Sequence, residues 1–311
     1  MMSNEELMEV LKAFVSTTTG GVASAQDAEE FIDLAVDQTA VLGAIRVETD
    51  IKSSMNVDSL EISEPSMMSD TEGEAPADAD IIAPSIPRKT LTPKPVRADY
   101  DVSFKWLRKN IAGERANEQL NQLFAKRWGK DSVQLIFNGD TSLSATSRTN
   151  KLLMVLDGFL KTAAADANVH AYDIPTTPNY SGKGGVFNEM LQLLPKDYRD
   201  DRESLAFFVS QNVLDDYLDE LGERQTALGD TTLLRGEKTP YKGVVIWGVY
   251  KMPDDEIILT PSSNLVVGYG GDMEVGRFSN VRKGRLEVTI RGDIDAKYIS
   301  SDALVYGKAA A

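Results

Sequence analysis

Residues 103 to 128, SFKWLRKNIAGERANEQLNQLFAKRW, predict the one long helix that this sequence indicates without ambiguity. Most of the apolar residues lie three or four positions apart, on one side of a helix, and charged residues occupy the rest. The apolar residues are Phe104, Leu107, Ile111, Leu120, Leu123, Phe124 and Trp128. Ser103 can cap the start of this helix. At 1.5 Å per residue, about 25 residues make a rod of roughly 37 Å, which is longer than a compact domain of ordinary size is wide. We therefore predict a broad, flattened subunit with this helix as its spine.

The segment before this helix reads as an extended loop. Residues 46 to 62 are extended, residues 63 to 87 are polar with several prolines, and residues 95 to 103 alternate between apolar and polar side chains. Such alternation predicts a strand with two unlike faces. Because a two-stranded ribbon is marginal by itself, we expect this arm to lie on another surface, such as a neighbouring subunit. A disordered linker is the alternative for residues 63 to 87.

The negative charge is concentrated in this loop. The chain has 311 residues and a net charge of −15, and the stretch from Glu48 to Asp80 holds ten acidic residues against the single basic residue Lys52. An acidic chain of this kind is not expected to grip DNA or an anionic membrane by bulk electrostatics. Residues 1 to 45 predict two short helices joined by TTTGG, and these either form an arm on another surface or pack on their own domain.

The remainder predicts an α+β fold, with helices early and an antiparallel sheet built from late segments. After a turn at Asn138 and Gly139, residues 150 to 167 predict one amphipathic helix, and a loop with His170 leads to a shorter helix that Pro195 stops. A buried strand at 204 to 211 precedes a helix capped by Asn212. Late strands are expected at 243 to 250, 256 to 261, 264 to 269, 285 to 292 and 303 to 307.

The residue types argue against an enzyme or a metalloprotein. With one histidine and no cysteine, a catalytic triad would need His170, and nothing near it resembles a nucleophile elbow; the usual zinc sites are excluded for the same reason. GKGG at 182 to 185 lacks the spacing of a phosphate-binding loop, and the acidic run lacks that of an EF-hand. No cofactor is expected. A hydrolase using carboxylate pairs such as Asp200/Asp201 or Asp254/Asp255 remains an alternative of another class.

The order of parts resembles that of the major capsid proteins of tailed bacteriophages, the Hong Kong 97-like coat proteins. FIDLAVDQTAVLGAIRVETD is similar to the end of their N-terminal arm and the first strand of their extended loop. VRADYDVSFKWLRKN resembles the returning strand and spine helix, FFVSQNVLDDYLDEL the strand and helix of the axial domain, and GVVIWGVYKMPDDEIILTP the segment before the final strands. The resemblance covers roughly residues 25 to 307 and rests on the order and spacing of parts.

The resemblance implies an N-terminal arm at 1–45, an extended loop at 46–102 and a peripheral domain with the spine helix at 103–170. An axial domain at 171–250 and a return to the peripheral domain with C-terminal strands at 251–311 complete the expected organisation. The short N-terminal segment leaves no room for a fused scaffolding segment, so a separate scaffolding protein is expected. No pattern matches the lysine-asparagine crosslink of some members, although Lys89 and Lys94 lie in the loop.

The resemblance further implies a non-enzymatic protein that assembles as pentamers and hexamers into an icosahedral shell around double-stranded DNA. Its partners would be copies of itself, the scaffolding protein, a portal, a decoration protein, and packaged DNA bound without sequence specificity, with no membrane. Its location would be the virion, after assembly in the host bacterial cytoplasm. A shell protein of an encapsulin-like bacterial compartment is the alternative. We predict that Arg88, Lys89 and Arg97, at the return of the loop, pair with carboxylates of an adjacent subunit.

Overall fold

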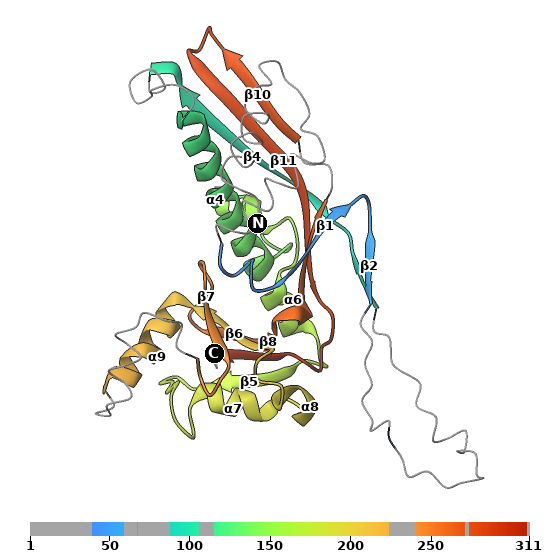
Figure 1. The fold of residues 1–311 in the computed structure, drawn as a ribbon, viewed down its shortest axis with the longest axis vertical. Coiled ribbons are helices and arrows are strands. Elements are labelled where there is room, and N and C mark those ends of the chain that lie inside the picture. Colours follow the sequence, from blue (N-terminus) through green and yellow to red (C-terminus); the bar gives the residue numbers. More distant parts are fainter. Residues whose placement is uncertain are drawn as a thin grey trace, which may run out of the picture.

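Two five-stranded sheets and a long helix organise the molecule (Figure 1). The computed structural model describes residues 39–58, 67, 88–105, 115–223, 240–270 and 274–309. The helices predicted in the first 38 residues lie outside this part of the chain, as does most of the acidic segment between 59 and 87.

The first sheet combines early and late strands. Its order is β1-β9-β11-β10, and β4 pairs with β11 as well. The strands are β1 (Arg46–Ile51), β4 (Lys94–Ser103), β9 (Leu265–Gly270), β10 (Glu274–Asn280) and β11 (Arg285–Tyr298). The β1–β9 pairing is parallel, whereas β11 is antiparallel to β4, β9 and β10. A separate two-stranded ribbon, β2 (Met55–Asp58) with β3 (Arg88–Leu91), projects beside this sheet (Figure 1).

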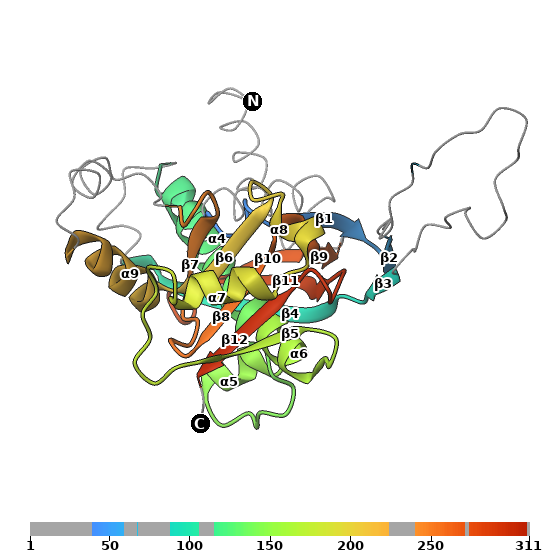
Figure 2. The ribbon, with the colours of Figure 1, turned by 90° about the horizontal axis from the view of Figure 1, so that it is seen from below.

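The second sheet has the order β5-β12-β8-β6-β7. Its strands are β5 (His170–Ile174), β6 (Leu205–Ser210), β7 (Val245–Val249), β8 (Glu256–Pro261) and β12 (Val305–Ala309). The helices α7 (Val186–Leu193) and α9 (Gln211–Glu223) pack on it, with the single-turn α8 (Lys196–Arg199) beside α7 (Figure 2). The ring of Phe187 on α7 lies 4.6 Å from that of Phe207 on β6 and 5.3 Å from that of Tyr217 on α9. These apolar side chains give the sheet a core of its own on this face.

A second, larger core joins the two sheets through the long helix α4 (Arg115–Asn138). Phe124 on α4 stacks on Tyr100 of β4 with ring centroids 4.1 Å apart, and Phe137 lies 5.5 Å from Phe208 of β6. Successive residues of β6 therefore face different cores, because side chains alternate along a strand. With both faces covered, every residue of β6 is buried, as the apolar run at 204 to 211 predicts.

The long helix is present, but its bounds differ from the prediction. The described α4 begins at Arg115 and ends at Asn138, ten residues beyond the predicted end at 128, whereas residues 106–114 lie outside the described part. In the extra turns Ser132 to Phe137 are all buried, including the polar Ser132 and Gln134, so no solvent-facing side marks this part of the helix. The helix stops at the predicted turn, where the Gly139 N–H donates to the Leu135 carbonyl at 2.8 Å.

Three other predictions are wrong in detail. The single helix at 150 to 167 is two helices, α5 (Arg148–Leu153) and α6 (Phe159–Ala165), because the chain between them crosses the end of α4 at Gly158. The cap of α9 is Ser210, whose Oγ accepts from the Val213 N–H at 3.2 Å, rather than Asn212. The late strands do not form one antiparallel sheet.

Those late strands instead divide between the two sheets, where they pair with early strands. Three strands were not predicted: β3, which lies before the expected strand at 95 to 103, β5, which starts at His170 in the expected loop, and β10. The mixed α+β class itself is confirmed.

Candidate assembly surfaces

The described residues contain few side-chain groups arranged as a catalytic or metal site would need. Among them, no group of three or more histidine, aspartate or glutamate side chains could hold a metal ion, and no helix is long and apolar enough to cross a membrane. His170 starts β5, where its backbone pairs with Val305. The pairs Asp200/Asp201 and Asp254/Asp255 are exposed and lie outside the helices and strands.

The first surface is the outer face of β4, β11 and β10, on the side of this long sheet away from α4. The alternation predicted for β4 is present: Val96, Ala98, Tyr100 and Val102 pack on the main core, whereas the intervening residues are exposed. Strand register places residues from the three strands in rows across this face. One row is Glu274, Arg291 and Arg97, and the next but one is Phe278, Glu287 and Asp101.

Charges on this outer face neutralise one another in pairs. Arg97 contacts Asp99 at 3.0 Å, Arg285 contacts Asp101 at 2.5 Å, Lys283 contacts Glu287 at 3.2 Å and Arg291 contacts Glu274 at 3.7 Å. The hydrogen bond that Arg285 donates to Asp101 raises the pKa of the Arg285 guanidinium above its ordinary value. Exposed pairs of this kind contribute only about 0 to 1 kcal/mol each, so they add little to folding. The charges within these four pairs balance, so the pairs add no net charge to this face in a chain of net charge −15.

Apolar side chains stand at the far end of the same face. Phe278 on β10 is 63% exposed, and Val281 in the β10–β11 turn is 81% exposed. Both belong to the hairpin that projects at one end of the molecule (Figure 1). An exposed aromatic ring on a neutral, ion-paired face is typical of a surface that contacts another protein.

The second surface is the β2–β3 ribbon. Its inner side is anchored: Val57 and Leu91 are buried with Ile51, Val266 and Ile299. The backbone N–H of Thr92 donates to the carboxylate of Asp295, which is 4% exposed, at 2.8 Å. The ribbon therefore leaves the body from a packed base. The predicted ribbon of the strands at 46 to 62 and 95 to 103 is therefore wrong in its pairing, because β1 and β4 pair with the body and only β2 and β3 pair with each other.

Each of the three cations predicted to contact a neighbouring subunit also meets a partner in its own chain. Arg88 contacts Asp58 across the ribbon through two bonds of 2.7 and 3.0 Å, and these bonds lower the pKa of Asp58. Lys89 lies 5.6 Å from the ring centre of Tyr298, and Arg97 pairs with Asp99. The Arg88 and Arg97 side chains remain 61% and 60% exposed, so both are accessible to a second partner.

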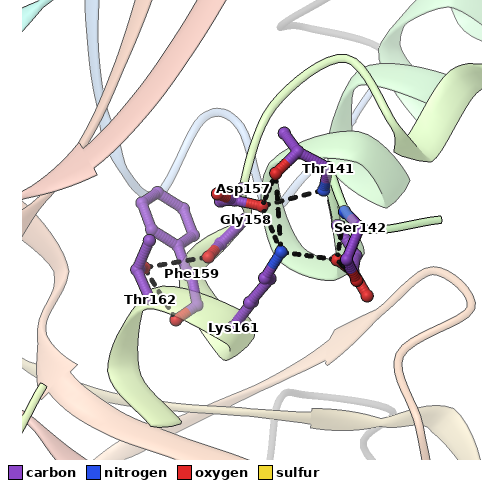
Figure 3. A network of polar contacts seen from close by, with 8 residues as sticks. Thr141, Ser142, Asp157, Gly158, Phe159, Lys161 and Thr162 are labelled. Carbon is purple, nitrogen blue, oxygen red and sulfur yellow. Dashed lines mark hydrogen bonds and ion pairs between the residues drawn. The ribbon is translucent and has the colours of Figure 1, made fainter. Parts of the chain in front are cut away.

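A polar network, shown in Figure 3, fastens the end of α4 to the start of α6. Lys161 bridges Asp140 at 2.5 Å and Asp157 at 2.7 Å. The bond from Lys161 is the main cause that lowers the pKa of Asp140 to about 2, with help from the Ser142 side chain and N–H. Burial works to raise the pKa of Asp157, but bonds from Lys161 and Thr141 outweigh it and lower it. The network joins side chains of this chain to one another, which indicates a structural clamp.

Comparison with known proteins shows which proteins this chain is similar to. No family model matches the chain. A Bacillus subtilis (strain 168) protein, YqbE, which carries the name of a prophage capsid protein, is 23% identical over 315 residues, covering 97% of each chain.

Solved capsid and procapsid structures also resemble this chain, at lower sequence identity. A chain of the satellite phage P4 procapsid that includes the size determination (Sid) protein is 17% identical, with a TM-score of 0.64 over 90% of this chain and 98% of that one. The capsid of an empty GTA particle is 15% identical, with a TM-score of 0.56 over 88% and 90% of the two chains.

Proposed function

Since the chain has the Hong Kong 97-like fold of tailed-phage capsid proteins, we propose that it is a major capsid protein that assembles with copies of itself into a closed shell. The observation that carries this proposal is the agreement of fold over nine-tenths of the chain, together with the near-complete coverage of the YqbE relative. The shell would enclose double-stranded DNA as an icosahedral array of pentamers and hexamers.

Within this proposal most parts of the molecule take the roles expected from the sequence, and the segment 251–311 is the exception. The first sheet with α4 is the peripheral domain, and the second sheet with α7 and α9 is the axial domain. Residues 1–45 act as an N-terminal arm and residues 46–102 as an extended loop, of which the β2–β3 ribbon is the described base. Strands β8 and β12 belong to the second sheet, so the C-terminal part of the chain contributes to both domains.

The described surfaces support assembly physically. A ribbon whose two strands pair only with each other cannot gain much stability alone, and contact with a neighbouring copy would supply the missing burial. The neutral outer face of β4, β11 and β10 lets two copies approach without strong repulsion. Each contact between two copies can be weak, because a closed shell repeats it many times.

Partners other than the chain itself follow from the same proposal. A separate scaffolding protein would guide assembly, a portal would occupy one vertex, and a decoration protein would bind the outside. The acidic chain suits a shell wall that does not adhere to packaged DNA, because like charges repel at short range. The protein would reside in the virion after assembly in the bacterial cytoplasm.

Electron microscopy of the chain expressed with its scaffolding protein tests the proposal. Closed shells of uniform size are expected, and symmetric reconstruction should show pentamers and hexamers. Persistent monomers under all conditions, with the scaffold present, would contradict it. Particles from infected or induced cells that enclose a cargo protein in place of DNA would instead favour the encapsulin-like compartment.

A further inference from the structure

A basic cavity of about 370 Å³ lies on the second sheet domain, between α7, α8 and the turn before β7. Figure 2 shows α7 and α8 on the outer side of this sheet. Its lining contains three cations, two amides and one carboxylate, together with one apolar side chain. The lining residues are Asn188, Leu191, Gln192, Arg199, Asp200, Arg202 and Lys242.

Lys242 is held in place at the rim. Its φ of 50° and the φ of 90° at Gly243 give a tight two-residue turn, closed by hydrogen bonds in both directions between Tyr241 and Val244. Asparagine or glycine is preferred at the first of these positions, because other residues are strained there. The Lys242 Nζ donates to Oδ1 of the buried Asn188 at 2.5 Å and lies 5.2 Å from the Tyr241 ring centre. An ammonium group has three donors, so two remain for a ligand.

Within the described part of the chain, the cations of this cavity have no carboxylate partner. None of the ion pairs between described residues includes Arg199, Arg202 or Lys242, although Asp200, Asp201 and Glu203 adjoin them in sequence. The Arg202 Nη1 donates instead to the carbonyl of Lys242 at 3.2 Å, which ties the two together. Three cations and one carboxylate give this lining a net positive charge on a strongly acidic chain.

We propose that this cavity binds carboxylates of the acidic segment 61–80 of a second copy of the chain. This inference rests on the proposed function, which brings many copies into contact. The segment holds seven acidic residues and no basic one, so its charge complements that of the cavity. Arginine is suited to the task because its guanidinium binds a carboxylate through two parallel bonds. Both partners are present on every copy, so the contact repeats around a ring of copies.

Peptide binding tests the recognition step. A fluorescent peptide of residues 61–80 is titrated into the chain and followed by anisotropy. The triple variant Arg199→Gln, Arg202→Gln and Lys242→Asn removes the cations, and asparagine suits the turn. The control variant Lys126→Gln, Arg148→Gln and Lys151→Gln removes the same charge from exposed residues elsewhere. We expect the cavity variant to bind at least tenfold more weakly than wild type, with the control close to wild type. Equal binding by the two triple variants would overturn the proposal.

Cysteine crosslinking tests whether the segment comes from a second copy. The chain has no cysteine, so Gln192→Cys at the cavity and Met67→Cys in the segment can be placed on separate copies. Diamide is the oxidant that converts the two thiols to a disulfide. We expect crosslinked dimers when the two variants are co-assembled. A crosslink that forms only within one chain carrying both cysteines would overturn the second-copy assignment.

The two proposals fail in distinguishable ways. Well-formed shells without the crosslink, and without loss of peptide binding in the cavity variant, would overturn this inference alone. Absence of shells from the wild-type chain would overturn the proposed function, and the peptide titration would still decide whether the cavity recognises the segment. Inorganic phosphate is added as a competitor. Binding of phosphate with no binding of the peptide would make the cavity a small-anion site and contradict the proposal.

Discussion

Replacing Gly158 by alanine should destabilise the folded chain severely, because two backbone segments cross at this residue. A Cβ atom at Gly158 would lie 2.5 Å from the Phe137 carbonyl oxygen, 2.6 Å from the Gly139 nitrogen and 2.8 Å from the Ile136 carbonyl oxygen. All three are backbone atoms at the end of α4, so no side chain can rotate away. Any backbone movement that relieves these contacts would also break the 2.9 Å hydrogen bond from the Gly158 N–H to the Gly139 carbonyl.

The expected loss of unfolding free energy combines these two effects. Overpacking typically costs about 1 to 3 kcal/mol, and losing one hydrogen bond about 1 kcal/mol, so we expect a loss of about 2 to 4 kcal/mol. Urea unfolding of the monomeric chain, followed by tryptophan fluorescence to which the buried Trp128 contributes, measures this quantity. The matched control is Gly184→Ala, because nothing lies within 4 Å of a Cβ there. That change should be neutral or stabilise by up to about 1 kcal/mol. A Gly158→Ala variant within 0.5 kcal/mol of the control would refute the crossing as described.

Three further predictions concern the clamp, the ribbon and the loop cations. Lys161 lowers the pKa of Asp140 from 3.8 to about 2, so this carboxylate stabilises the fold above pH 4 and the stability is lost as the pH falls from 4 to 2. Lys161→Met should make unfolding midpoints in urea fall less steeply over that range, and an unchanged slope would contradict the assignment. Leu91→Ala should cost about 2 to 5 kcal/mol of local stability and accelerate amide exchange in β2 and β3 beyond that in β6, because Leu91 is fully buried at the base of the ribbon. Reversing charge with Arg88→Glu, Lys89→Glu and Arg97→Glu should reduce the yield of shells in micrographs while the urea midpoint changes little, and normal assembly would count against an intersubunit role.

Local periodicity predicted those elements whose burial is simple. Strand β4 has one face on the core and one in solvent, so its alternation was visible in sequence. The end of α4 was less visible, because Ser132 to Phe137 are buried on almost all sides and show no helical stripe. Turn chemistry at Asn138 and Gly139 located the end of the helix better than periodicity did.

Pairing between distant segments could not be predicted in the same way. Arg46 on β1 pairs with Val266 on β9, and no local pattern of residues specifies a partner that far along the chain. The same reason hid the in-chain partner of Arg88, because Asp58 lies thirty residues earlier. The basic cavity was missed because Arg199 and Arg202 meet Lys242 only in the folded chain, and each looks like an ordinary solvated cation in sequence.

Charge placement limits how copies of this chain can meet. The outer face of β4, β11 and β10 is neutral through its own ion pairs, so it neither attracts nor repels a second copy strongly. Most of the excess negative charge sits between Glu48 and Asp80, where copies would repel one another unless cations approach. Salt screens this repulsion over a Debye length of about 10 Å at 0.1 M, but it also weakens a contact between that segment and the basic cavity. Because salt weakens both the repulsion between copies and this attraction, we expect the yield of assembled shells to rise and then fall with increasing salt. A neutral-surface contact alone would instead strengthen steadily as repulsion is screened.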